Sequence, residues 1–425
     1  MKLVVVGGVA AGLSAASRAR RLDRNADITV LEKGSRISYG ACGLPYLIEG
    51  QVGSLDELTV YTPAFFENER DIRVRTNSEV VGIQHSRREV TLRSGEKVPY
   101  DRLVWAAGAR PAMPFAGRNV FCLHTDKDAL RLESFLREQR PKTAAVIGGG
   151  YIGLELATAL RARGLEVSVH HEATTLLNRE DDWLSKRVAE RLERCRIALH
   201  LNTRVNSADS LGADLVVVAT GLKPNVELLA EAGAGLGRSG ALTVDERMET
   251  TLSGIYAAGD CCEARHIVTG RPAWIPLGTT ANRMGRVAGA NATGARERFE
   301  GIAGTAIVRI GGMAVAVTGL SSQQARREGF SPVEVVVEGR NRPKYFHGRK
   351  VAIQLVADRN SRRLLGAAIV GDQGVAGRID VVATALAAKM RPDALAEVDL
   401  AYAPPYGTAT DPLITAAHQL VKVLD

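Results

Sequence analysis

The sequence predicts an α/β fold in which a strand–turn–helix–strand unit occurs twice and a smaller α+β domain follows. The two units span residues 2–34 and 143–173, and each starts with a β-branched run, turns on glycines and returns to a short apolar strand. After about residue 320 the chain contains strand-like runs such as VEVVVEG and a helical stretch, RIDVVATALAAKM. We therefore expect two Rossmann-like domains and a C-terminal α+β domain in close contact.

Composition narrows the class of protein. The chain has 425 residues, 45% of them hydrophobic, which is enough for two or three domains. No apolar run reaches the roughly 20 residues of a membrane helix, and LVVV is followed at once by GGVAAG, so we predict a first strand in a cytoplasmic protein without a membrane partner. Five scattered cysteines indicate a reducing compartment. The net charge is +8, but Lys and Arg form no long basic blocks along the chain. This favours phosphate-bearing small molecules over nucleic acid as partners.

The first glycine turn has the outer positions of a dinucleotide-binding motif. Gly7 and Gly12 occupy those positions and Val9 stands in the middle. Glu32 closes the second strand 20 residues after Gly12, where a carboxylate would bond a ribose diol, and Lys33 follows it as a further candidate contact. We expect a nucleotide to bind here with its pyrophosphate on the helix N-terminus.

The second turn has a complete GxGxxG formed by Gly148, Gly150 and Gly153 between a strand and a helix. The next strand ends in VSVHHEA, which places His171 at the ribose position and Glu172 one place later. A histidine there would not repel a 2′-phosphate, so the sequence slightly favours NADPH over NADH. A surface histidine with NADH bound is the alternative.

Two nucleotide sites in one chain suggest a flavin and a nicotinamide. The strand IYAAG ends at Asp260, whose carboxylate could bond the ribityl chain of a flavin. With WAAGARP at 105–111, VVATGLKPN at 217–225 and IYAAGD at 255–260, the chain resembles the flavin-dependent pyridine nucleotide-disulfide oxidoreductases from residue 1 to beyond 410. The resemblance implies a homodimer with a split FAD domain (1–112 and 245–320), an NAD(P)H domain (113–244) and a dimerisation domain (321–425).

A single thiol lies in the segment SYGACGLPY, residues 38–46. Most relatives use two cysteines in CxxxxC, but here Ser38 stands four residues before Cys42, so no internal redox disulfide can form. The thiol would alternate with a mixed disulfide, a persulfide or a sulfenic acid, and Ser38 is a candidate substrate contact. We expect Cys42 at the start of a helix, with Pro45 in the first turn, where the helix N-terminus lowers the pKa of a thiol. A buried, inert cysteine is the alternative.

The single-cysteine pattern resembles the branch that contains coenzyme A-disulfide reductase, CoA-dependent persulfide reductase, and NADH oxidase and peroxidase. Oxidases and peroxidases of this branch place a histidine where this chain has Ala10, which favours disulfide or persulfide reduction. The resemblance implies that Tyr402 in YAPP and Tyr345 in PKYFHG approach the thiol from the partner subunit, and that Arg18 and Arg21 contact a CoA phosphate. Packing tyrosines and solvated arginines are the alternatives.

Together these patterns predict a homodimeric FAD enzyme that passes a hydride from NAD(P)H to the flavin and reduces CoA disulfide through a Cys42–CoA mixed disulfide. Reduction of CoA persulfide or polysulfide is the main alternative. An NADH oxidase and a redox-sensing flavoprotein are the others. The remaining cysteines have no metal-ligand spacing, so we expect no metal site.

Overall fold

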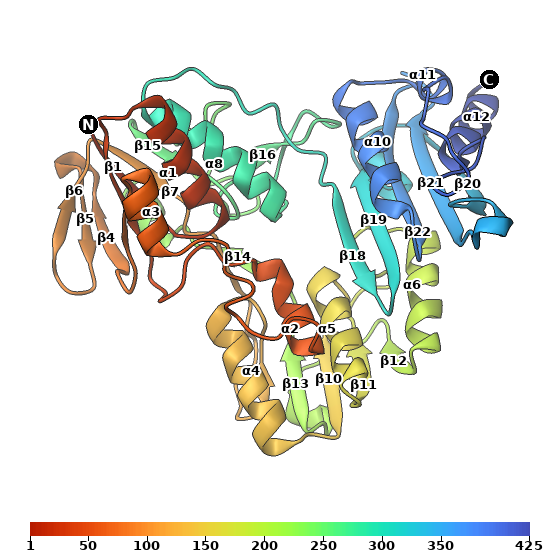
Figure 1. Cartoon of the computed structure of the whole chain (residues 1–425), viewed down its shortest axis with the longest axis horizontal. Helices are drawn as coiled ribbons and strands as arrows, with labels where there is room; N and C mark the ends of the chain where they lie inside the picture. The colour runs from red at the N-terminus through yellow and green to blue at the C-terminus, as the bar shows by residue number, and fades with distance from the viewer.

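The computed structural model describes residues 1–425 and arranges them around three large sheets (Figure 1). The first sheet is parallel, in the order β15-β7-β1-β2-β3, so the first strand of the chain lies at its centre. Its strands are β1 (Lys2–Val6), β2 (Asp27–Leu31), β3 (Arg73–Arg75), β7 (Arg102–Trp105) and β15 (Ile255–Ala257).

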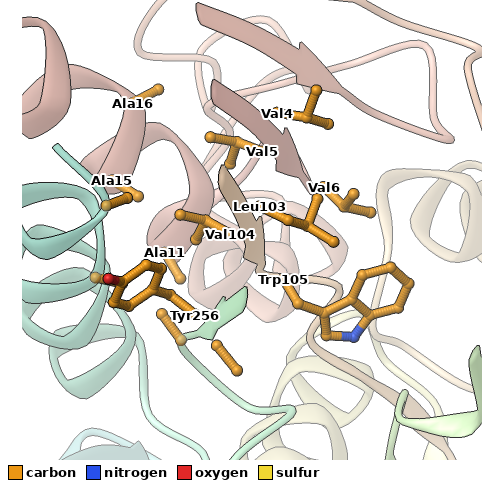
Figure 2. Packing of buried hydrophobic residues seen from close by; sticks show 14 of the residues in the cluster. Val4, Val5, Val6, Ala11, Ala15, Ala16, Leu103, Val104, Trp105 and Tyr256 are labelled. Carbon is orange, nitrogen blue, oxygen red and sulfur yellow. The ribbon is translucent and has the colours of Figure 1, made fainter. Parts of the chain in front are cut away.

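Helices α1 (Ala10–Leu22) and α8 (Gly278–Ala292) lie against each other and pack on this first sheet. Its central strands are almost wholly apolar because protein covers both of their faces. Figure 2 shows the alanines of α1 beside the valines of β1 and β7, with Tyr256 of β15 close by. Small side chains on α1 let the helix approach the strands closely.

The second sheet is also parallel, in the order β12-β11-β10-β13-β9. Its strands are β9 (Val120–Phe121), β10 (Thr143–Ile147), β11 (Glu166–His170), β12 (Ile197–His200) and β13 (Leu215–Val218). Helices α4 (Asp126–Gln139), α5 (Tyr151–Ala162) and α6 (Asp182–Arg194) belong to this unit. An antiparallel pair, β8 (Ala109–Pro111) with β14 (Leu222–Pro224), joins the segments that enter and leave it. The second unit is thus inserted into the first.

The third sheet is antiparallel, in the order β18-β19-β22-β21-β20. Its strands are β18 (Ala306–Ile310), β19 (Met313–Gly319), β20 (Pro332–Arg340), β21 (Lys350–Asp358) and β22 (Leu364–Gly371). Helices α10 (Val375–Ala387), α11 (Pro392–Ala396) and α12 (Pro412–Leu424) complete the unit. The sequence boundary at residue 321 differs from this arrangement, because β18 and β19 come before it and pair within the third sheet. The motif VRIGGMAVAVTG is compatible with a hairpin in either the first or the third unit. Only the strand pairing assigns it to the third.

Shorter elements complete the chain. They are α2 (Leu44–Glu49), α3 (Pro63–Arg70), α7 (Glu227–Glu231), α9 (Ser322–Arg327), β4 (Val80–Gln84), β5 (Glu89–Leu92), β6 (Lys97–Pro99), β16 (Ala264–Arg265), β17 (Pro272–Ala273) and single 3₁₀ turns at 41–43, 85–87, 209–211 and 344–346. No helix is long and apolar enough to span a bilayer. The three units confirm the predicted α/β class with a C-terminal α+β domain.

Candidate active site

Both glycine turns fold in the same way at the carboxyl end of a central strand. Gly7 and Gly148 adopt φ values of +108° and +118°, which a side chain rarely tolerates. A Cβ on Gly12 would lie 1.9 Å from the carbonyl oxygen of Gly7, and one on Gly153 would lie 2.1 Å from that of Gly148. The glycines therefore let each helix start close under its strand.

The helices that follow these turns present free N–H groups. Val9 precedes α1 and Gly150 precedes α5, and neither helix has a side-chain cap. A Cβ on Gly150 would meet no atom closer than 3.8 Å, so this residue leaves open space in front of the helix. Uncapped N–H groups at the positive end of a helix are suited to a pyrophosphate.

Glu32 lies at the ribose position of the first unit. Its carboxylate is buried and accepts hydrogen bonds from the main-chain N–H of Gly8 (2.7 Å) and of Gly34 (2.6 Å). These two bonds fix the carboxylate while leaving lone pairs for the hydroxyls of a ribose. Lys33 points into solvent without a hydrogen bond or ion pair, so the structure gives it no defined place in the site.

His171 occupies the same place in the second unit. Val6 pairs with Leu31 in the first sheet and Ile147 with His170 in the second, so the residue that follows is Glu32 in one and His171 in the other. The N–H of Gly149 donates to Nδ1 of His171 (3.1 Å), while Nε2 lies 3.0 Å from the carbonyl oxygen of Thr175. Because a carbonyl only accepts, Nε2 carries the proton and the ring is neutral with both nitrogens used. His171 therefore adds no negative charge to the nucleotide site and keeps no free acceptor for a ribose.

Asp260 follows β15, and the protein donates no hydrogen bond to its carboxylate. Desolvation raises the pKa of this carboxyl group, and the nearby His124 acts in the opposite direction. A half-buried carboxylate without a protein donor fits a hydroxyl-rich ligand such as the ribityl chain of a flavin. Together with Glu32 and the first glycine turn, it makes the first unit a suitable site for FAD.

Cys42 lies in the 3₁₀ turn of residues 41–43 that leads directly into α2, whose first turn contains Pro45. It is free and exposed, unlike the buried, inert thiol that was the alternative. Ser38, at the start of this loop, has the left-handed φ of +50°, and its N–H donates to the carbonyl oxygen of Gly8 (3.0 Å). This bond attaches the thiol loop to the first glycine turn.

The expected lowering of the pKa of Cys42 is wrong. Although the residue as a whole is exposed, neighbouring protein atoms partly desolvate the thiolate and raise the pKa, and the charges of Glu155 and Asp260 raise it further. Helix α2 has only six residues, and the dipole of so short a helix does not outweigh these effects. The sequence showed the helix start but not the two carboxylates, which come from distant segments.

Three residues near the thiol loop were missed from the sequence. Tyr46, Glu155 and Arg309 come from α2, α5 and β18, and hydrogen bonds join them. The only signals were a tyrosine four residues after Cys42 and a glutamate one turn into the helix of the GxGxxG motif.

Arg18 and Arg21 lie on α1 within a larger group of arginines. Desolvation and the positive charges of Arg70, Arg18 and Arg286 lower the pKa of Arg21. Arg18 is ion-paired with Glu297, whereas Arg21 is exposed and makes no ion pair. The sequence missed Arg70 and Arg286, because α3 and α8 bring them to α1 only in the folded chain.

Tyr345 and Tyr402 both lie on the surface of the third unit. They are 69% and 50% exposed. Tyr345 is in the 3₁₀ turn 344–346 between β20 and β21, two strands that Figure 1 shows well away from α2. Within one chain no hydrogen bond joins either tyrosine to Cys42.

Most of the chain matches known sequence families. Residues 1–294 match the pyridine nucleotide-disulphide oxidoreductases, and residues 305–413 match the dimerisation domain of the same group. The protein belongs to this family. As a pyridine nucleotide-disulphide oxidoreductase it uses FAD and NAD(P)H, which its two glycine turns fit, and it carries a dimerisation domain. The match to that domain starts just before β18, in agreement with the strand pairing.

Several members of the family resemble this oxidoreductase along its whole length. It is 36% identical to the NAD(P)H coenzyme A polysulfide/persulfide reductase of Pyrococcus horikoshii, over 99% of this chain and 98% of that protein. It is 32% identical to the NADH oxidase of Methanocaldococcus jannaschii, over 100% and 99%, and 31% identical to the coenzyme A disulfide reductase of Staphylococcus haemolyticus, over 96% and 97%. The solved structure of an NAD-dependent persulfide reductase from A. fulgidus aligns with a TM-score of 0.95 at 38% identity, over 100% of this chain and 83% of that one.

Proposed function

We propose that this oxidoreductase reduces coenzyme A disulfide with electrons from NAD(P)H, through a mixed disulfide between Cys42 and coenzyme A. The observation that carries the proposal is the exposed Cys42, which has no second thiol in its loop and lies next to a flavin-type nucleotide turn. A thiol without an internal partner needs an external one to complete a redox cycle, and the sulfur of a small-molecule disulfide can serve as that partner.

The chemistry follows from thiol–disulfide exchange. The Cys42 thiolate attacks one sulfur of CoA disulfide, a bond forms between Cys42 and that sulfur, the CoA–CoA bond breaks, and one CoA thiolate leaves and takes up a proton. Two electrons and a second proton then reduce the mixed disulfide, which releases the second CoA and restores Cys42. In sum, NAD(P)H, a proton and CoA disulfide give NAD(P)⁺ and two CoA thiols. When bound, FAD supplies the route by which two electrons pass from NAD(P)H to the sulfur.

We assign the cofactor contacts to the residues that form the two turns. Gly7, Gly12, Glu32 and Asp260 would hold FAD, while Gly148, Gly150 and Gly153 would hold the nicotinamide dinucleotide. The neutral His171 supports acceptance of NADPH, because it adds no negative charge at the ribose.

The substrate contacts are assigned to charged and phenolic groups. Arg21, Arg70 and Arg286 form no ion pair with a carboxylate, so their guanidinium groups can bind phosphate groups of CoA. Arg18 is less available because Glu297 already neutralises it. Tyr345 and Tyr402 would reach the thiol of the partner subunit, where a phenol can bond the departing thiolate. Their exposure on the dimerisation domain is compatible with this role.

Reduction of CoA persulfide is a second candidate, favoured by the names of the similar proteins at 36% and 38% identity. Attack of the Cys42 thiolate on the outer sulfur would leave a Cys42 persulfide and release a CoA thiolate that takes up a proton. Two electrons and a second proton would then release hydrogen sulfide and restore the Cys42 thiolate. An NADH oxidase is also among the similar proteins. Ala10, which starts α1, cannot supply the proton that peroxide chemistry needs.

The test is product stoichiometry with the purified flavoprotein and either nicotinamide. For CoA disulfide we expect two CoA thiols for each NAD(P)H oxidised. CoA persulfide would give one CoA and one sulfide, and an oxidase would consume NAD(P)H with oxygen and release no thiol. Cys42→Ser should abolish thiol release, whereas the matched change Cys122→Ser, at another free cysteine, should not. Turnover of CoA disulfide by Cys42→Ser at the wild-type rate would contradict the mechanism.

A further inference from the structure

The ribose position of the second unit needs a cation if it is to hold a 2′-phosphate. His171 does not supply one, because its ring is neutral and both of its nitrogens are already hydrogen-bonded. No Lys or Arg occurs among the next residues, 172–178. Arg179, which follows them, is buried and donates to the carbonyl oxygen of Gly319. A cation for this position therefore has to come from another segment of the chain.

The loop after β12 lies beside the segment that follows β11. The two strands pair in parallel, so both loops leave the carboxyl ends of the strands, where nucleotides bind in folds of this kind. The main-chain N–H of Thr203 donates to the carbonyl oxygen of His171 (2.9 Å). The N–H of Asn202 donates in the same way to Ala173 (3.3 Å). These two bonds fix the backbone of the second loop against the ribose position.

Arg204 is the next residue of this loop. Its Nη1 lies 3.7 Å from Oε1 of Glu172, which places the guanidinium beside the residue that follows His171. Both side chains of this ion pair are exposed, so the pair contributes little energy and exchanges easily for a stronger one. A phosphate monoester carries more negative charge than a carboxylate and binds a guanidinium through charge-assisted, often bidentate hydrogen bonds. It is therefore the stronger partner for Arg204.

We propose that Arg204 binds the 2′-phosphate of NADPH and so sets the preference between the two nicotinamide nucleotides. Glu172 holds the guanidinium near the ribose position until the phosphate replaces it as the partner. The neutral His171 adds no negative charge that would oppose the phosphate. NADH has a hydroxyl at this place and gains no ion pair with Arg204. The inference rests on the proposed assignment of the second glycine turn to the nicotinamide nucleotide.

The test is the binding of NADP⁺ and NAD⁺ to the FAD-loaded protein, measured by isothermal titration calorimetry. The oxidised nucleotides do not reduce the flavin, so binding is measured without turnover. Arg204→Gln should raise the Kd of NADP⁺ by about tenfold and leave that of NAD⁺ unchanged, because only the phosphate loses a partner. Arg204→Lys keeps the charge without the bidentate geometry, so its Kd for NADP⁺ should be intermediate.

Glu172→Gln changes the same ion pair from its other side. It frees the guanidinium of Arg204 and removes a carboxylate close to the bound phosphate. The Kd of NADP⁺ should therefore fall, by about two- to threefold because the pair is exposed, while the Kd of NAD⁺ should stay the same. A rise in the Kd of NADP⁺ would contradict the proposed exchange of partners.

Arg196→Gln is the matched control, since it removes an exposed arginine immediately before β12, at the amino end of the same strand. Both of its Kd values should equal those of the wild type. An unchanged ratio of the two Kd values in folded Arg204→Gln would overturn the proposal. The same would follow from an equal change in Arg196→Gln, or from no measurable binding of NADP⁺ to the wild type.

Binding of neither nucleotide to the wild type would contradict the assignment of the second glycine turn itself. Titration needs neither CoA nor Cys42, so a failure of Arg204 to discriminate the nucleotides is distinguishable from a failure of the proposed reduction of CoA disulfide.

Discussion

At the end of the second strand of each nucleotide-binding unit, one side chain accepts a hydrogen bond from a main-chain N–H of the glycine turn. Glu32 does so with a carboxylate oxygen and His171 with Nδ1. The carboxylate retains lone pairs for a ribose, whereas the histidine gives its remaining N–H to Thr175. The same backbone position therefore offers an anion in the flavin unit and a neutral, saturated ring in the nicotinamide unit.

This difference predicts how an acidic residue at position 171 would change the preference between NADPH and NADH. His171→Glu should accept the Gly149 N–H as Glu32 accepts that of Gly8, bond a ribose diol and repel a 2′-phosphate. We expect the ratio of kcat/KM for NADPH to that for NADH to fall by about tenfold or more, equivalent to about 1.4 kcal/mol. Steady-state kinetics with both nucleotides measure it.

Glu172→Gln tests the neighbouring carboxylate. Glu172 is exposed and lies 3.7 Å from an equally exposed Arg204, an ion pair of little energetic weight. Its removal should change the nucleotide ratio far less than His171→Glu does. A larger effect from Glu172→Gln would mean that position 172, rather than 171, sets the nucleotide preference.

At the scale of elements, α1 and α8 touch backbone to backbone. A Cβ on Gly285 would lie 2.1 Å from the carbonyl oxygen of Ala11, and one on Gly289 would lie 2.1 Å from that of Ala15. Two glycines four residues apart thus form the contact face of α8. Since α1 starts at the first glycine turn, this contact also sets the position of the flavin site.

Gly289→Ala should therefore destabilise the protein. The added methyl group cannot avoid a backbone oxygen, so the helices must separate, at a cost of about 1–3 kcal/mol. The thermal midpoint followed by circular dichroism, together with release of FAD, reports the loss. Gly377→Ala is the control, because a Cβ at this exposed position of α10 meets nothing within 4 Å. An equal loss of stability in both variants would contradict the close-contact explanation.

At the scale of the molecule, the units are joined by polar groups as well as by apolar cores. Arg179, which follows the second glycine unit, is buried and donates to the carbonyl oxygen of Gly319 at the end of β19. His266, in the loop between β16 and β17, is only 4% exposed, and burial and then the charge of Arg179 lower its pKa to about 4. All three units thus contribute to one buried region.

His266 predicts a loss of stability in mild acid. Its pKa is about 6.5 in an unfolded chain and about 4 in the fold, so the unfolded state binds more protons between these values. Stability should fall as pH drops from about 6.5 towards 4, by up to roughly 3 kcal/mol. Thermal midpoints across this range measure the loss. His266→Gln should flatten the slope, and a slope unchanged by the substitution would assign the acid sensitivity to other groups.

A second prediction at this scale concerns the dimer. If Tyr402 serves the thiol of the partner subunit, Tyr402→Phe and Cys42→Ser should each lower activity strongly in homodimers. A heterodimer of the two variants would then contain one intact site and recover about half of the wild-type activity. No recovery in the isolated heterodimer would show that the tyrosine does not act across the interface.

The sequence by itself determined the repeated βαβ units, the glycine turns and the lone thiol. These features depend on local periodicity and on residues such as Gly7 and Gly148, whose conformations few other residues adopt. Neighbours along the chain were enough to predict them, and the family match confirmed the fold and the cofactors.

Only the tertiary structure decided which distant groups act on the site. In the fold the third unit starts at β18, and both nitrogens of His171 are used in hydrogen bonds. The fold also places Glu155 and Asp260 where they raise the pKa of Cys42. The spacing of a motif fixes where a helix starts, but the proton affinity of a thiol depends on every charge that the fold brings within a few ångströms. Those charges come from segments more than a hundred residues away, which no local pattern can place.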